Sequence, residues 1–468
     1  MSVLERGRAT RLGARAGRRL SGWGRTTFSR ARVVRASSHD EVVALLGEGE
    51  RTRDGVLARG AGRSYGDAAQ VAGGTVLDLT GLAETIEIDR ERKLVRVDAG
   101  VTYAQLLARL IPAGLMIPVI PGTRHVTLGG AIASDVHGKN HPVDGSIAGL
   151  VEALTLVTPG GCVYELTAES GGELLATTIG GLGLTGVVTS ATLRVESLAA
   201  PGWLVDTDRT DSLEQTLALM SRDEGHRYNV AWLDLLARGA QSGRAVVTRS
   251  RDAQPGELPS DGAPREDLSH ASRLTIPPGF PGWVLQPLAI AAFNGLRWRA
   301  FPRHERGKPV RAEHHFFPLD GFGAWNRLYG AQGLFQYQFV VGDQHADVLI
   351  DAVRLLAARR VPVFLAVLKR LGEADGCPLS FPMPGWTLAL DIPAGAAGAR
   401  QTLDALDERV AQCGGRVYLT KDVRLRRDLL EAMYPELGRF HAARELVDPD
   451  GVMRSDLGQR LGLCGPLR

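Results

Sequence analysis

The first two hundred residues alternate short apolar runs with turns rich in glycine, aspartate and proline. Such runs recur at 56–58, 75–79, 86–88, 94–99, 153–158 and 187–195. Their length and their bounding residues predict β-strands. Two segments have helical spacing instead: 39–47, with Ser37 or Ser38 as N-cap, and 102–111, which begins at Thr102 and ends at Pro112. The N-terminal part is therefore expected to be rich in strands with few helices.

The second half of the chain predicts strands and helices in alternation. Strands are expected at 335–341, 363–368, 386–392 and 414–419, and helices at 346–358 and 399–413. This order predicts an α+β fold in which helices cover an antiparallel sheet. A chain of 468 residues is expected to form two or three domains. From shifts in composition we expect a basic segment at 1–30, a first domain at 31–198, a second at 199–414 with a mobile insertion at about 250–315, and a C-terminal segment at 415–468.

Charge and cysteine content exclude several classes of protein. A net charge of +3 is too small to indicate a nucleic-acid partner. Residues 1–35 are rich in arginine with one acid, Glu5, which fits either a frayed terminus or a contact with an anionic membrane surface. The four cysteines are widely spaced without a CxxC pair, so we expect no disulfide framework, no metal site and a cytoplasmic location.

No apolar run is long enough to span a membrane, and the nearest approach is residues 283–296. Arginines follow this run at 297, 299 and 303. The pattern fits an interfacial segment that contacts lipid, or a partly buried helix beneath a loop. Both alternatives stay open at the level of sequence.

Glycine is unusually frequent, at 57 residues, and gathers in two stretches, 59–67 and 121–140. Glycine loops let backbone N–H groups approach a ligand and bind a pyrophosphate without a lysine. The first stretch imitates the spacing of a dinucleotide-binding fingerprint, but a strand rather than a helix is expected after it. No GxxxxGK[ST] motif is present. The two loops therefore predict a backbone cradle for a large phosphorylated cofactor of another kind.

Longer motifs are far more specific than the glycines alone. They are GRSYGD at 62–67, PGTRHVTLGGAIASDVHGKNH at 121–141, GGLGLTGVV at 180–188, FQYQF at 335–339, PLSFPMPGW at 378–386 and YLTKDVR at 418–424. The chain resembles the vanillyl-alcohol-oxidase superfamily, with its PCMH-type FAD-binding domain. Within that superfamily it resembles the decaprenylphosphoryl-β-D-ribose 2-oxidase family, the flavin subunits of an epimerase. The resemblance extends from about residue 18 to 461.

The resemblance implies FAD as cofactor, no metal, and a C-terminal segment that returns to the flavin. Many relatives attach flavin covalently through a histidine in the first loop, where this chain has Arg63, so non-covalent FAD is expected. The implied cofactor-binding residues are Ala58, Arg59, Gly60, Ala61, Gly62, Arg63, Ser64, Tyr65, Gly66, Asp67, Ala68, Gly122, Thr127, Leu128, Gly129, Gly130, Ser134, Asp135, Val136, His137, Val188 and Tyr418.

Alcohol oxidation needs a hydride acceptor and a group that takes the hydroxyl proton. The candidate catalytic residues are Lys421, His137 and Tyr65. The candidate substrate ligands are Lys139, Phe316, Gln336, Gln338, Lys369, Thr387 and Ala389, with both glutamines on one strand face and Lys369 as a phosphate partner. Members of the family carry tyrosine, asparagine and cysteine where this chain has Phe316, Thr387 and Ala389.

The implied reaction is the FAD-dependent oxidation of the 2-hydroxyl of a polyprenylphosphoryl-β-D-ribose, which begins an epimerisation for cell-wall arabinan. The implied partners are a lipid-linked sugar phosphate and an NAD(P)H-dependent short-chain reductase, at the inner face of the plasma membrane. Two alternatives remain: a soluble sugar or alditol oxidase that uses oxygen, and a non-catalytic flavoprotein or membrane-associated scaffold.

Overall fold

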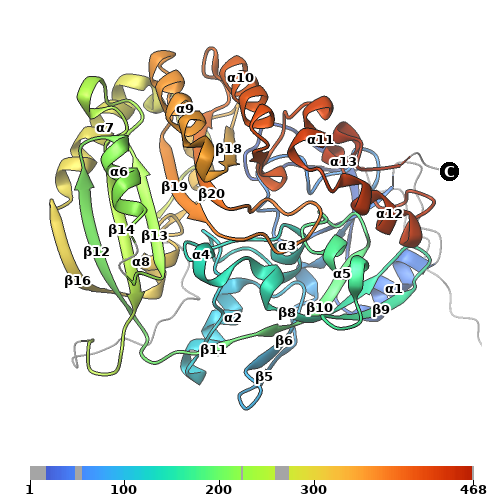
Figure 1. Ribbon diagram of the computed structural model, residues 1–468. Coiled ribbons are helices and arrows are strands. Elements are labelled where there is room, and N and C mark those ends of the chain that lie inside the picture. The colour runs from blue at the N-terminus through green and yellow to red at the C-terminus, as the bar shows by residue number, and fades with distance from the viewer. Residues whose placement is uncertain (1–16, 48–54, 223–224, 259–273, 466–468) are drawn as a thin grey trace, which may run out of the picture.

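The computed structural model describes residues 17–47, 55–222, 225–258 and 274–465. Most of the expected basic N-terminal segment lies outside these ranges. Two sheets build the N-terminal part (Figure 1). One has the strand order β1-β2-β4-β3, with β2, β4 and β3 parallel. Its bounds are β1 Arg18–Leu20, β2 Ser29–Arg35, β3 Val56–Arg59 and β4 Thr75–Asp78.

The other N-terminal sheet is antiparallel, in the order β5-β6-β10-β8-β9. Its strands are β5 Ile86–Asp89, β6 Leu94–Asp98, β8 Val151–Val157, β9 Val163–Thr167 and β10 Val187–Arg194. Strands β7 Leu115–Met116 and β11 Glu196–Ser197 form a separate antiparallel pair. The helices of this part are α1 His39–Gly47, α2 Tyr103–Leu110, α3 Leu128–Ala133, α4 His141–Asp144 and α5 Gly172–Thr178.

The two helices expected here begin where the sequence indicates. Ser38 Oγ accepts from Glu41 N at 3.2 Å at the start of α1. Thr102 caps α2 through a capping box, in which Gln105 Oε1 accepts in turn from Thr102 N at 2.9 Å. These local signals are sufficient because each satisfies backbone N–H groups that a helix start leaves unpaired.

The second part is built on an eight-stranded sheet in the order β16-β12-β14-β13-β19-β20-β18-β21. The strands are β12 Trp203–Thr210, β13 Tyr228–Leu233, β14 Ala245–Asp252, β16 His304–Val310, β18 Leu334–Val341, β19 Leu365–Leu371, β20 Gly385–Pro393 and β21 Arg416–Val417. All of its neighbouring strands are antiparallel. A short parallel pair, β15 Leu274–Thr275 and β17 Phe322–Gly323, stands apart from it.

Alternation along these strands divides the sheet into two faces. On β18, Phe335, Tyr337 and Phe339 belong to the largest apolar core, together with Leu349 and Leu403. Those last two residues lie on α9 Ala346–Ala358 and α10 Ala399–Gln412, which cover this face (Figure 1). The α+β class is therefore confirmed, with helices on one face and the other free to line a cavity.

The interpretation of residues 250–315 as an insertion is wrong for much of that segment. Residues 259–273 lie outside the described part of the chain. The remainder includes helix α7, Pro287–Ala300, strand β16 and helix α8, Ala312–Phe316. Strand β16 pairs with β12 over most of its length, so it is the edge strand of the main sheet. Helix α6, Leu213–Met220, lies between β12 and β13 along the chain.

The C-terminal segment packs back on the N-terminal part. It contains α11 Leu430–Met433, α12 Leu437–Val447 and α13 Asp456–Leu461. Met453 forms a parallel bridge with Val56 on β3, and Arg460 pairs with Asp67 at 2.9 Å. These contacts hold residues 418–422 beside the first glycine loop, where Tyr65 N donates to Thr420 O at 3.2 Å.

Candidate active site

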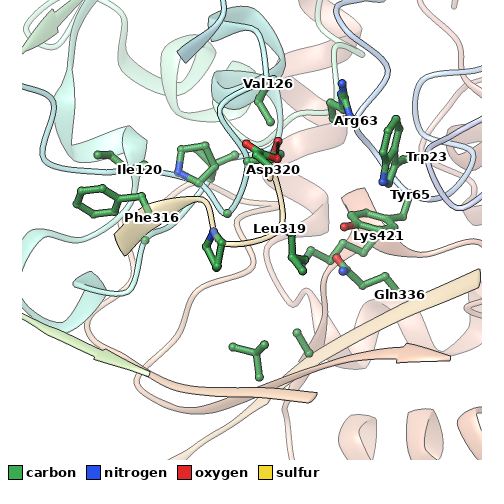
Figure 2. A pocket seen from close by; sticks show the side chains of 18 of the residues that line it. Trp23, Arg63, Tyr65, Ile120, Val126, Phe316, Leu319, Asp320, Gln336 and Lys421 are labelled. Atoms are coloured by element: carbon green, nitrogen blue, oxygen red, sulfur yellow. Dashed lines mark hydrogen bonds between the residues drawn. The ribbon is translucent and has the colours of Figure 1, made fainter. Parts of the chain in front are cut away.

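A cavity of about 1110 Å³ lies between the two glycine loops and the open face of the main sheet. Its volume exceeds the roughly 300–1,000 Å³ of ordinary small-molecule sites. Figure 2 shows Trp23, Arg63 and Tyr65 on one wall, and Ile120 and Phe316 on another, with Leu319 and Asp320 between them. Lys421 and Gln336 lie below Tyr65 in the same view.

The first loop presents its backbone to the cavity because it packs tightly against the second. A Cβ added to Gly60 would lie 2.0 Å from Thr127 Oγ1, and Gly62 has φ +65°. The Arg59 guanidinium stabilises the loop from within, donating to Ala69 O at 2.6 Å and to Ser21 O at 2.8 Å. Side chains at the two glycines would separate the loops or strain the backbone.

The second loop adds an open glycine surface. No heavy atom lies within 4 Å of a Cβ built on Gly122, and only Thr127 Oγ1 approaches one on Gly130. Both residues line the cavity. Polar wall atoms without a hydrogen-bond partner among the described residues include Arg63 Nε, His137 Nδ1 and Thr420 Oγ1. Exposed glycine backbone and unpaired polar groups fit a flavin dinucleotide, whose pyrophosphate accepts from N–H groups.

Lys421 lies in a 3₁₀ turn, Leu419–Lys421, rather than at the end of the long strand that the sequence predicted. Its Nζ is 5.8 Å from the ring centroids of both Tyr65 and Tyr418. Burial, reinforced by the charge of Lys369, lowers the pKa of Lys421 to about 7, against an opposing effect of Asp391. The surroundings of Lys421 thus favour its neutral form more than water does.

Two further half-buried lysines line the same cavity. Lys369 on β19 has its pKa lowered to about 8 by burial. Lys139, in the second loop, also has a pKa lowered to about 8, by burial and by Lys369, and its Nζ donates to His315 O. Three lysines from separate elements therefore face one space, a concentration of positive charge that an anionic ligand would stabilise.

His137 joins the second loop to the floor of the cavity. Gln338 Nε2 donates to His137 Nε2 at 3.1 Å, and Thr387 Oγ1 accepts from the same amide at 3.0 Å. Burial and the positive charge of Lys369 hold the pKa of His137 well below its usual range, so the ring is neutral. In this arrangement its proton lies on Nδ1.

Sequence reasoning missed the cavity carboxylates Asp391, Asp320 and Glu305. Asp391 on β20 accepts from Gln336 Nε2 at 2.7 Å, and burial raises its pKa to about 6. Asp320 accepts from Thr123 Oγ1 and from Arg124 N, both at 2.8 Å, and so attaches the second loop to the segment after α8. Strand alternation from Ala389 could have found Asp391, whereas no local signal indicates Asp320.

Most of the expected site residues line the cavity, and five do not: Gly66, Asp67, Leu128, Asp135 and Thr387. Gly66 packs on the carbonyl of Asp422, and Asp67 pairs with Arg460. Leu128 is a core residue. Asp135 is fully buried and accepts from Ser146 Oγ and Ser380 Oγ. The first four residues pack behind the loops, and Thr387 on β20 accepts from Gln338 Nε2. Their expected direct contact with the ligands stays a prediction.

Comparisons with known proteins agree with this geometry. Residues 30–167 match the model of an FAD-binding domain family. The chain is 38% identical to decaprenylphosphoryl-beta-D-ribose oxidase of Mycolicibacterium smegmatis, over 95% of this chain and 98% of the relative. It is 30% identical to L-gulono-1,4-lactone dehydrogenase of Mycobacterium tuberculosis, over 94% and 98%. An alditol oxidase of a Streptomyces species is 26% identical over 92% and 96%.

The fold, the glycine-lined cavity and these relatives define an FAD-dependent oxidoreductase that acts on a CH–OH group. The cofactor is FAD. Within that class, the chain belongs to the decaprenylphosphoryl-beta-D-ribose oxidase family.

We expect the flavin to be released when the protein is denatured in acid. Arg63 cannot form the bond that a histidine forms with flavin, and its guanidinium stacks on Trp23 at 4.0 Å. After precipitation, the yellow colour should stay in the supernatant with the mass of intact FAD. A yellow pellet after washing would contradict non-covalent binding.

Proposed function

We propose that this protein oxidises the 2-hydroxyl of a polyprenylphosphoryl-β-D-ribose to the 2-keto sugar. The observation that carries the proposal is the set of half-buried lysines 139, 369 and 421, which line one cavity with Gln336 and Gln338. A phosphate compensates buried positive charge, and paired amides suit sugar hydroxyls. The printed name of the relative from M. smegmatis supports the same substrate class.

Bound FAD supplies the hydride acceptor. The chain's own residues orient the sugar and control its proton. Gln338 is held by His137 and Thr387, and Gln336 by Asp391, so both amides are fixed before substrate binds. Lys421, with its pKa near 7, takes up the hydroxyl proton when neutral or stabilises negative charge when protonated.

The carbonyl of a 2-keto sugar must be reduced, from the opposite face, to complete an epimerisation. An NAD(P)H-dependent short-chain reductase is the partner of that chemical class, and the product would be an arabinose donor for cell-wall arabinan. We propose a cytoplasmic location with peripheral contact at the inner face of the plasma membrane. Exposed Leu288 and Leu296 on α7, with Arg299 in its last turn, support the contact.

Among the described residues, no helix combines the length and the apolarity needed to cross a bilayer. The expected contact is therefore argued from α7 alone. Replacing Leu288 and Leu296 by aspartate should weaken binding to anionic liposomes, and unchanged binding would refute the membrane contact.

Anaerobic flavin bleaching tests the proposed substrate. A short prenylphosphoryl ribose should reduce the holoenzyme, while free ribose and xylitol at the same concentration should not. Rapid bleaching by a free polyol with no response to the phosphorylated lipid would favour the sugar or alditol oxidase. Bleaching by none of them would favour a flavoprotein without this catalytic role.

We expect KM for the phosphorylated substrate to rise above pH 8. Lys139 and Lys369 have pKa values of about 8, so each loses its proton through that range and no longer attracts the phosphate. The rise should reach about tenfold per pH unit when one charged lysine is required. KM should be measured from pH 6.5 to 9.5, with Lys369→Met as the comparison.

Lys369→Met should raise KM at low pH and flatten its dependence on pH. A wild-type KM that stays constant up to pH 9.5 would contradict a lysine-bound phosphate.

A further inference from the structure

The active-site cavity continues across the open face of the main sheet, well beyond the residues that the reaction needs. Adjacent strands place their cavity-facing residues in a row: Gln338 pairs with Ala389, Ala389 with Val367, Val367 with Trp232, and Trp232 with Val246. All five line the one cavity. The floor is thus one unbroken surface formed by successive strands.

The chemistry of this floor changes along the row. Near the flavin loops it carries Gln336, Gln338, Asp391 and Lys369. On β13, β14 and β12 the floor residues carry no charge; they are Val230, Trp232, Val246, Thr248, Val205 and Thr207. A polar head with an apolar extension is the shape that an amphiphilic ligand fills.

A roof covers the apolar part. Helix α7 contributes Phe293, which stacks on Phe364 with 5.6 Å between ring centroids. The Arg297 guanidinium lies 5.2 Å from the ring centroid of Trp232 and 5.3 Å from that of Phe301. The trough ends at β16, where Lys308 pairs with Glu305 at 3.2 Å. Mostly apolar walls, with Arg297 stacked over Trp232 and the Lys308–Glu305 pair at the far end, favour a hydrocarbon chain that leaves toward water.

We propose that this trough, the open face of β13, β14, β12 and β16 beneath α7, binds the first isoprene units of the substrate's prenyl chain. The inference rests on the proposed function, because Lys369 on β19 then holds the phosphate at the head of the trough. The prenyl chain runs from β19 across the four strands to the edge of the sheet.

The width of the sheet sets the length of prenyl chain that the trough binds. Four strand spacings of about 4.8 Å span about 19 Å. An isoprene unit adds four carbon–carbon bonds of about 1.5 Å, or about 4–5 Å when extended. About four units therefore fit, and the rest of a longer chain lies outside the protein.

A series of prenylphosphoryl riboses with one, two, three, four and six isoprene units tests the inference, as monomers with the holoenzyme. The second-order rate of anaerobic flavin reduction should rise about tenfold for each unit up to four, because each buries apolar surface. It should then stay level to six. Reduction at one rate for every length would overturn the trough while leaving the proposed function intact. No reduction by any member would instead refute the proposed function.

A blocking variant locates the chain. Thr248→Trp fills the floor at β14, two strands from Lys369. The rate of flavin reduction should therefore stop rising with chain length at about two isoprene units. Substrates with one or two units should react within about twofold of the wild type. Leu446→Trp, at an 83% exposed position on α12, adds the same bulk outside the cavity and should change nothing.

Val205→Phe, one strand farther, gives a second test should Thr248→Trp lose its flavin. In this variant the rate of flavin reduction should stop rising at about three isoprene units instead of about four. Equal chain-length profiles in Val205→Phe and the wild type would overturn the proposed path.

Discussion

Replacing Lys421 by methionine should slow flavin reduction by about 100- to 1,000-fold while FAD stays bound, the usual cost of removing one positioned electrostatic group. Methionine keeps the length of the side chain and removes its charge and proton. Lys421 is half-buried at the cavity wall, and its Nζ lies 5.8 Å from two tyrosine ring centroids, so the methionine variant has no other cation at that place. The rate should be measured at saturating substrate in stopped flow, with FAD content from the flavin absorbance.

Lys421→Arg separates the two roles of this residue. Arginine stays charged in proteins, so it can stabilise negative charge but cannot accept a proton. Recovery of the rate, with loss of the pH dependence near 7, would indicate an electrostatic role. A rate for Lys421→Arg as low as that of Lys421→Met would indicate that Lys421 transfers the proton. Reduction of Lys421→Met at the wild-type rate would contradict any catalytic role.

Replacing Gly66 by alanine should destabilise the protein by about 2–4 kcal/mol and displace the catalytic turn. The added Cβ would lie 1.6 Å from the carbonyl oxygen of Asp422 and 3.2 Å from Val423. Because these contacts are largely to backbone, the first loop or the turn that carries Lys421 must move. Urea unfolding should give the loss of stability, and flavin reduction should slow in the same variant.

Gly438→Ala is the matched control, since no heavy atom lies within 4 Å of its added Cβ on helix α12. Alanine there should be neutral or slightly stabilising. A Gly66→Ala protein with the stability and reduction rate of Gly438→Ala would contradict the close packing of the first loop on residues 418–422.

Elements with strong periodicity could be predicted well from the sequence. The expected helix at 346–358 is α9, because its apolar face packs on the main sheet. Strand β16 was missed, since an exposed edge strand of sequence HERGKPV has no buried face and so no alternation to detect. The strand expected at 414–419 is only β21, because Tyr418 leads directly into the turn of Lys421.

The segments that line the cavity could be predicted from the sequence, but the direction of each side chain could not. Glycine loops and long motifs indicate which segments approach a cofactor. They do not indicate which way each side chain points. Asp67 precedes the cavity residue Ala68, yet its carboxylate pairs with Arg460, 393 positions away. That choice depends on tertiary packing, and so does the burial of Asp391 beside Gln336.

The central claim is that the substrate loses hydride from C2 of a lipid-linked ribose to FAD. A prenylphosphoryl ribose with deuterium at C2 tests it most directly, by anaerobic stopped flow with the holoenzyme. We predict a clear primary isotope effect on flavin bleaching, and a product that carries a new carbonyl at C2. Equal bleaching rates with and without deuterium, together with a carbonyl at another carbon, would contradict the account.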